Sequence, residues 1–200
     1  MQNKSFYNRN KGNKPGKTSI NTLERTKHRF SKKEPYEKHG TQLENKDGLI
    51  DHVIYVGRVV KVVKGGRRFS FSVLAVAGDG KGKVGIGLGK AVEMADAIRK
   101  AIEKSKTYLK PVALLENTIP HSVIGVFGAS KVILKPAAEG VGLVASTAVR
   151  SILNSVGVKN VVSKCIGNRN EYNVTRATLA GLFKLRTIDC VEKRRGVSYE

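Results

Sequence analysis

The chain has 200 residues, of which 40% are hydrophobic, and it carries 37 Lys and Arg against 16 Asp and Glu, a formal net charge of +21. This length allows one domain or two small ones with a buried core. Such a charge attracts polyanions: nucleic acid is the first candidate partner, and an anionic membrane surface is the second. The sequence has neither an apolar run of about 18 residues nor an apolar signal core, so we expect a soluble cytoplasmic protein.

Residues 1–46 form a first segment rich in Asn, Lys, Arg, Ser and Gly, and its few apolar residues follow neither a helical nor a strand period. Such a composition cannot offset the entropy of ordering by burial, so we predict a disordered basic N-terminal arm. Two interpretations stay open. The arm folds along RNA, with aromatic residues such as Phe6 and Tyr36 stacking on bases, or it is a solvated tail.

The first predicted folded unit covers residues 47–108. Its expected elements are strands at Val53–Val63, Phe69–Ala77 and Val84–Leu88 and a helix at Lys90–Tyr108. In the middle strand, apolar residues alternate with a face that begins polar, which is typical of a sheet with one covered face. We expect the helix to lie on that face through an apolar stripe of Val92, Ala95, Ile98 and Ile102.

The segment Lys64-Gly65-Gly66-Arg67 joins the first two of these strands. Glycine reaches positive φ without a Cβ clash, so the glycine pair predicts a tight hairpin with a type I′ or II′ turn. Five cations lie along this hairpin: Arg58, Lys61, Lys64, Arg67 and Arg68. Together they form an electrostatic surface suited to phosphates, whose contacts fix position and carry little sequence information. For any single side chain, an ordinary solvated strand edge is the alternative.

The second predicted unit covers residues 109–186 and again combines strands with helices. We expect a hairpin of Ser122–Phe127 and Lys131–Leu134, a helix that ends at Gly157, a strand at Val158–Ile166 and a last helix with Asn170 as N-cap. Residues 187–200 are expected to form a basic tail. The predicted fold class is therefore α+β, with two small sheet-plus-helix domains.

The glycine-rich segment Gly80–Gly85 matches G-x-G-x-x-G. A dinucleotide site needs a helix after this motif, so that phosphate meets the helix N-terminus, whereas a strand is predicted here. The following residues resemble the end of a Walker loop, but Val84 stands where the first glycine is required and Ala91 replaces the Ser or Thr. We interpret the outward face of this strand as a surface on which another protein backbone or an RNA backbone lies flush, formed by Gly85, Gly87 and Gly89.

The sequence contains no constellation that indicates catalysis. Its four histidines are scattered, and no H-x-x-x-H, G-x-S-x-G or closely spaced acid pair is present. Cys165 and Cys190 are far apart, so we predict reduced thiols without a metal or a disulfide. We expect no enzyme, no cofactor and no small-molecule substrate, and we keep a nucleotide-binding enzyme as the alternative to be excluded.

Several segments resemble one family in chain order: Val59–Phe71, Gly78–Gly80, Val84–Ala91, Lys135–Gly142 and Asn173–Thr178. They resemble the fifth protein of the bacterial small ribosomal subunit, over roughly Leu49 to Leu185. The resemblance implies an N-terminal domain like the double-stranded-RNA-binding fold and a C-terminal domain with a left-handed βαβ-type crossover. The chain departs from the family at Glu171, where a proline is usual.

For function, the resemblance implies binding of small-subunit ribosomal RNA at the junction of body and head. It also implies contacts with the fourth and eighth small-subunit proteins, a place near messenger RNA, and a part in translational accuracy. A regulator that binds RNA outside the ribosome is the alternative.

The resemblance also implies roles for single residues. It puts the loop Lys64–Arg67 near the RNA pocket used by spectinomycin, Arg58 near the channel through which messenger RNA enters, and Gly142 and Arg150 at the interface with the fourth protein. The full set that we predict to contact RNA is Arg58, Lys61, Lys64, Gly65, Gly66, Arg67, Arg68, Lys81, Lys83 and Lys90.

Overall fold

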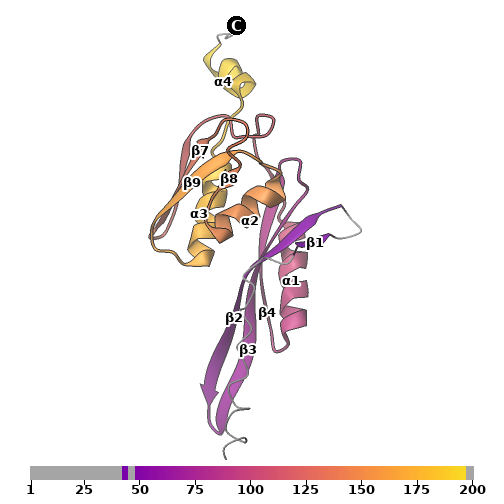
Figure 1. Ribbon diagram of the computed structural model, residues 1–200. Helices are drawn as coiled ribbons and strands as arrows, with labels where there is room; N and C mark the ends of the chain where they lie inside the picture. The colour runs from indigo at the N-terminus through magenta and orange to yellow at the C-terminus, as the bar shows by residue number, and fades with distance from the viewer. Residues whose placement is uncertain (1–41, 45–47, 197–200) are drawn as a thin grey trace, which may run out of the picture. The chain divides into compact units, whose positions relative to one another are not determined.

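The computed structural model describes residues 42–44 and 48–196, which form two sheets, each with helices packed on it (Figure 1). The strands are β1 (Gln42–Glu44), β2 (Ile50–Val63), β3 (Gly66–Gly78), β4 (Lys83–Ala91), β5 (Lys110–Pro111), β6 (Val123–Phe127), β7 (Ser130–Pro136), β8 (Leu143–Val144) and β9 (Val161–Gly167). The helices are α1 (Met94–Thr107), α2 (Thr147–Val156), α3 (Glu171–Leu182) and α4 (Ile188–Arg195). No helix in the described part of the chain is long and apolar enough to cross a membrane.

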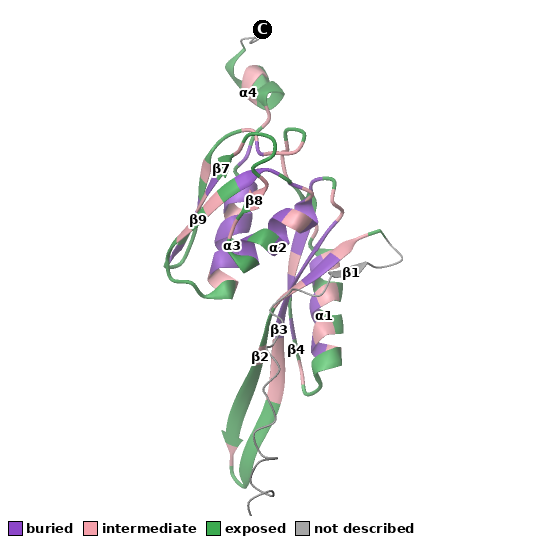
Figure 2. Ribbon diagram, viewed as in Figure 1, coloured by how far each residue is buried: buried purple, intermediate pink, exposed green. Residues whose placement is uncertain are grey.

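The first sheet has the antiparallel order β1-β2-β3-β4-β5, and two of its strands are much longer than the rest. β4 pairs with β3 only as far as Ala91 opposite Phe71, while β2 and β3 remain paired up to Val63 opposite Gly66. Residues 59–70 therefore extend beyond the three-stranded part as a two-stranded ribbon. Together with the pair Arg58 and Phe71 at its base, this ribbon is the protruding hairpin, residues 58–71, which is mostly exposed (Figures 1 and 2).

The predicted hairpin is confirmed, but its predicted turn type is wrong. Because Val63 pairs with Gly66, the turn residues are Lys64 and Gly65 rather than the two glycines. Only Gly65 of these two has a positive φ, 90°. A type I′ turn needs positive φ at both positions and a type II′ turn needs it at the first, so neither fits.

Helix α1 lies on the glycine face of β4, and the two backbones approach each other closely. A Cβ placed on Gly85, Gly87 or Gly89 would lie 2.2, 2.0 or 2.1 Å from a backbone oxygen of α1. The helix side of the contact is also made of small residues, the buried Ala97, Ala101 and Ser105. The sequence suggested that a protein backbone or an RNA backbone lies on this glycine face. In the structure the backbone of α1 lies there.

This packing also explains why the predicted apolar stripe of α1 is only partly right. Ile98 and Ile102 pack against the buried cluster that contains Val73 and Ala75 of β3. Val92 precedes the helix and is 76% exposed, and Ala95 is exposed as well. The glycine face of β4 carries no side chains, so the backbone of α1 packs directly against it. The closest contact is therefore made by the small residues Ala97 and Ala101, each one position before the larger Ile98 and Ile102.

The prediction of one covered face is wrong, because the opposite face of β3 and β4 is also covered. Val76 and Val84 belong to the same buried cluster as Val149, Ile152 and Val156 of α2. The turn between β3 and β4 is bound to the end of α2: Gly80 N donates to Ser155 O at 3.0 Å, and Gly82 N donates to Val156 O at 3.0 Å. The two sheets therefore share one buried cluster, and a second cluster lies between β3 and α1.

The second sheet has the order β6-β7-β9-β8, with β8 and β9 parallel and joined through α2. This connection is a βαβ unit, and its left-handed crossover stays a prediction. Gly157 ends α2 with φ 95°, as predicted. The Asn170 N-cap is confirmed too, since its Oδ1 accepts a hydrogen bond from Tyr172 N at 3.0 Å.

Four short elements were not predicted. β1 lies inside the segment assigned to the disordered arm and pairs with β2, β5 pairs with the start of β4, β8 precedes α2, and α4 lies in the segment expected as a basic tail. The rest of the predicted arm, residues 1–41 and 45–46, lies outside the described residues. The domain limits 47–108, 109–186 and 187–200 remain predictions.

Candidate nucleic-acid interface

The protruding hairpin brings together the five cations predicted from the sequence, and all five side chains are exposed. Antiparallel pairing fixes which of them share a face, because residues directly opposite each other point to the same side. Arg58 and Arg67 lie on the face that continues toward α1, whereas Lys61 and Arg68 lie on the other face. Lys64 lies in the turn, so cations are presented on both faces and at the tip.

On the first face, the guanidinium of Arg58 stacks on an aromatic ring. Its Cζ lies 4.0 Å from the centroid of Phe69, within the range of a cation–π interaction. Phe69 is 43% exposed and Val62, near the tip, is 75% exposed. The hairpin therefore offers apolar surface between its charges, a feature that sequence reasoning did not include in the site. The sequence indicated this apolar surface, because Val60 and Val62 alternate along β2 in a segment that carries exposed cations.

On the second face, two cations are placed directly opposite each other. Lys61 pairs across the strands with Arg68, and like charges in this position are destabilising. Residues 58–71 contain no Asp or Glu to compensate them. The strands thus hold positive charges together at a cost in stability, which an external anion would offset.

The remaining predicted RNA contacts lie elsewhere. Lys81 and Lys83 are exposed in the turn at the far end of β3, whose 13 residues span about 40 Å at about 3.3 Å per residue. Lys90 is exposed opposite Ser72, near the start of α3. The structure therefore joins the hairpin residues into one surface, including Gly65 and Gly66. Lys81 and Lys83 are separated from this surface, whereas Lys90 lies next to its base, because its partner Ser72 follows Phe71.

The G-x-G-x-x-G turn has no phosphate-binding geometry. The N–H groups of Gly80 and Gly82 are bonded to the last carbonyls of α2, and Asp79 Oδ1 accepts from Lys81 N and Lys83 N, both at 2.8 Å. These are the donors that a phosphate loop would direct at its ligand. This turn fastens the second domain to the first and is not a nucleotide site.

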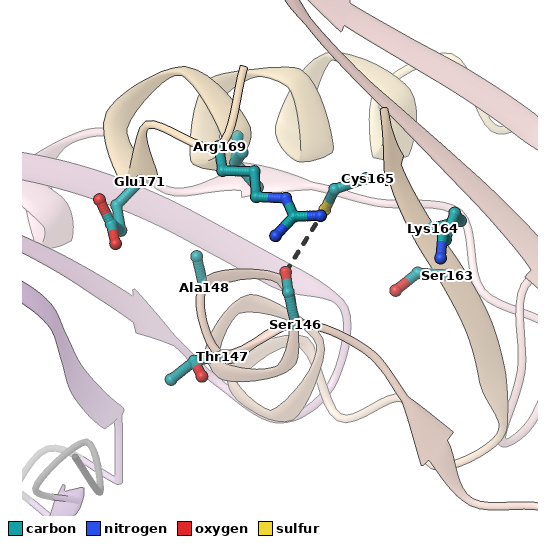
Figure 3. Close-up of a pocket in the computed structure, with 9 residues that line it drawn as sticks. Ser146, Thr147, Ala148, Ser163, Lys164, Cys165, Arg169 and Glu171 are labelled. Carbon is teal, nitrogen blue, oxygen red and sulfur yellow. Dashed lines mark hydrogen bonds between the residues drawn. The ribbon is translucent and has the colours of Figure 1, made fainter. Parts of the chain in front are cut away.

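A pocket of about 370 Å³ lies at the start of α2 (Figure 3). Ser146 Oγ lies 3.4 Å from Cys165 Sγ and makes no capping hydrogen bond to the helix. Arg169 and Lys164 line the pocket, but so does the carboxylate of Glu171. Because charges of both signs are present, we assign this pocket no ligand.

The two residues implied at a protein interface occupy different settings. Gly142 has φ 73°, and its N–H donates to Asn160 Oδ1 at 3.1 Å in the turn that leads into β8. Arg150 is exposed on α2. Both are accessible, and their contact with another protein stays a prediction.

A histidine is buried near the start of β2, opposite Val76 of β3. His52 in β2 is only 3% exposed, and its Nε2 has no hydrogen-bond partner. Burial disfavours the charged imidazolium and lowers the pKa of His52 below the ordinary value of 6.5. His52 is therefore a neutral structural residue at pH 7.

These features define the class: a basic α+β protein whose main exposed feature is a cationic hairpin and whose glycine-rich motif serves packing. The family model described as "Ribosomal protein S5, N-terminal domain" matches residues 49–113, and "Ribosomal protein S5, C-terminal domain" matches residues 125–195. The chain belongs to the ribosomal protein S5 family, a family of structural ribosomal proteins and not of enzymes.

Two relatives show how far this similarity extends. The small ribosomal subunit protein uS5 of Syntrophobacter fumaroxidans is 54% identical over 148 residues, which cover 74% of this chain and 89% of that protein. The protein of the same name from Lawsonia intracellularis is 52% identical over 149 residues, which cover 74% of this chain and 91% of that protein. The family recognised from the sequence is thereby confirmed.

Proposed function

We propose that this chain is a structural constituent of the small ribosomal subunit and holds ribosomal RNA through the protruding hairpin. One observation carries the proposal: residues 58–71 form an exposed two-stranded ribbon with five cations and no carboxylate. Phosphates supply the negative charge that the ribbon lacks, and contacts of this kind position a protein on RNA. The membership in the S5 family supports the same conclusion.

The shape of the hairpin suits a nucleic acid better than a membrane surface. Its cations are distributed over both faces and the tip, so they can meet phosphates on two sides of a groove. A flat lipid surface would engage one face only. The positive φ of Gly65 permits the narrow turn that brings the backbone close to its partner.

The family resemblance supports finer assignments, which are part of the proposal. Lys81, Lys83 and Lys90 would make separate RNA contacts, Arg58 would lie near incoming messenger RNA, and Gly142 and Arg150 would face the fourth small-subunit protein. The eighth protein would be a further neighbour, and these contacts would together support accurate decoding. The basic segment of residues 1–46 would bind RNA as an arm.

Sedimentation separates the ribosomal function from a free RNA-binding regulator. A tagged copy of the full chain, expressed in bacteria, is expected to sediment with small ribosomal subunits at moderate salt. A chain that stays in the soluble fraction would contradict the proposal and favour the regulator.

Removal of residues 1–41, which leaves β1 in place, tests the arm separately. We expect weaker RNA binding and a flatter dependence of affinity on salt, because fewer phosphates are neutralised. An unchanged salt dependence would refute the arm while leaving the hairpin proposal intact.

A further inference from the structure

A groove of about 710 Å³ lies between the two sheet-plus-helix domains, away from the protruding hairpin. One wall comes from β4 and α1, and the other comes from α3 and the end of β6. Its volume lies within the range of sites that hold a small organic ligand. None of the residues used in the proposed hairpin contact lines it.

Four aromatic side chains line this groove, two of them in contact. Phe127 and Tyr172 meet edge to face, with ring centroids 6.4 Å apart. Tyr108 is 65% exposed and Phe183 is 41% exposed. Exposed rings in a concave site leave π-faces available for stacking.

Three cations line the same groove among these rings. The guanidinium of Arg176 lies 5.5 Å from the ring centre of Phe127 and 5.2 Å from that of Tyr172. Lys110 Nζ lies 5.6 Å from the ring centre of Phe183. Among the described residues that line the groove, none is an Asp or Glu. The charge of the site is therefore suited to an anion.

The floor of the groove is a strand edge. β4 pairs with β5 only at Lys83 and Val84, so no described strand covers its outer edge from Gly85 onward. The carbonyl of Leu88 points out of this edge and accepts a hydrogen bond from Lys104 Nζ at 3.3 Å. Lys104 is thereby held at the groove, close to where a ligand would lie.

We propose that this groove binds an unpaired nucleotide of RNA, with the base stacked on the exposed rings and its phosphates bound by Lys104, Lys110 and Arg176. Alternation of aromatic rings and cations along a channel is the arrangement that binds single-stranded nucleic acid without sequence preference. The inference rests on the proposed function, in which RNA is the partner of the chain. It adds a second site that binds unpaired RNA. The hairpin holds phosphates of structured RNA, and the groove holds an unstacked base.

An extended acidic peptide paired to β4 is the competing occupant. Strand addition would use the edge N–H and C=O groups and the charges, but it gives no role to the exposed faces of Tyr108 and Phe183. Four rings among three cations favour a ligand that is both planar and anionic. The nucleotide meets both requirements.

The test uses the full chain and two labelled probes in fluorescence anisotropy. One probe is a single-stranded oligouridylate of about six nucleotides, and the other is an RNA duplex of about 16 base pairs. The groove variants are Phe183→Leu, which keeps apolar bulk and removes the ring, and Arg176→Gln. We expect each to weaken binding of the oligouridylate about tenfold and to leave duplex binding within about twofold.

Lys159→Gln provides the matched control, because it removes one exposed cation outside the groove. The hairpin variant Lys61→Gln with Arg68→Gln should show the reverse pattern, with the larger loss for the duplex. If the hairpin variant leaves duplex binding unchanged while the groove variants still weaken oligouridylate binding, the proposed hairpin contact is wrong and the groove inference stands. Circular dichroism checks that each variant is folded.

Three binding results would overturn the groove inference. The first is a loss no larger than that of Lys159→Gln, and the second is an equal loss for both probes. The third is displacement of the oligouridylate by an oligoglutamate peptide of equal charge, since this would show that only charge is recognised. Conversely, photocrosslinking of a 4-thiouridine oligomer to peptides that contain Tyr108, Tyr172 or Phe183 would support it, and crosslinks confined to the hairpin would contradict it.

Discussion

The protruding hairpin and strand β4 are built from the same residue types, yet they use them in opposite ways. In β4, the glycines leave room for the backbone of α1, as the oxygen 2.0 Å from a Cβ placed on Gly87 shows. In the hairpin, a Cβ on Gly65 or Gly66 would meet nothing within 4 Å. The β4 glycines are required because any larger side chain would collide with α1. Gly65 and Gly66 are required because the backbone has positive φ at both positions.

The difference shows where this chain puts stability and where it puts binding. Around β4, glycines and small residues produce close backbone contact, and the G-x-G turn is bonded to α2. Along the hairpin, none of the described helices or strands covers the strands near the tip, which are exposed (Figure 2), and Lys61 stands opposite the like-charged Arg68. The glycines of β4 therefore serve close packing inside the protein, whereas those of the hairpin lie on a surface that a partner can reach.

Substitution of Gly87 by Ala should have the largest effect on stability. The new methyl group would collide with Ala101 O, which the helix cannot easily move, so we expect a loss of about 3 kcal/mol in the free energy of unfolding. Urea denaturation measures it. Gly57→Ala is the control: it meets only the end of the half-exposed Tyr55 side chain, and we expect a loss below about 1 kcal/mol. Equal losses would break the comparison.

Substitution of Gly142 by Ala separates conformation from space. A Cβ here meets nothing within 4 Å, but φ is 73°, so an alanine is strained in the left-handed region. We expect a loss of about 1 kcal/mol in the free energy of unfolding by urea. Gly142→Asn should recover part of it, since asparagine tolerates this region better. No loss for alanine would show that the turn can rearrange.

Removal of one cation from the hairpin should have opposite effects on folding and on binding. Lys61→Gln removes the like-charge pair with Arg68, so the free protein should gain a few tenths of a kcal/mol in thermal unfolding. Its affinity for RNA should fall at the same time. Lower stability together with unchanged affinity would mean that Lys61 supports the fold and not the contact.

His52 should give the smallest effect, confined to acid conditions. Since burial lowers its pKa in the folded state, the unfolded chain binds more protons as the pH falls through about 6.5. Stability is then complete above that pH and decreases below it. Urea unfolding at about pH 7.5 and about pH 5.5 measures this dependence. In His52→Gln, this part of the pH dependence should be absent; its persistence would assign it to other groups.

The sequence predicts best the features set by local chemistry. The alternating strands, the Gly157 end of α2 and the Asn170 N-cap are confirmed because each depends on a few neighbouring residues. The cations of the hairpin were found for the same reason, since one tight turn brings distant parts of a short segment together. The sequence also argued correctly against a nucleotide site at the G-x-G-x-x-G motif, because the motif is followed by a strand and not by a helix.

Features that depend on tertiary contact could not be read in this way. The face of α1 that meets the sheet is set by the absence of side chains on β4, so small residues replaced the expected apolar stripe. The second covered face depends on a domain that begins more than 30 residues after β3, and short strands such as β8 carry too few residues for a pattern. The groove aromatics Tyr108 and Phe183 are single residues at helix ends, which no periodicity marks.

The central claim is that the protruding hairpin holds RNA phosphates. The most direct test is the dependence of RNA-duplex affinity on salt for Lys61→Gln with Arg68→Gln. The control is Lys159→Gln with Lys193→Gln, which removes the same charge from exposed positions outside the hairpin. We predict that the slope of log affinity against log salt falls by about 2 for the hairpin pair and is unchanged for the control. Equal slopes for the two double variants would contradict the claim.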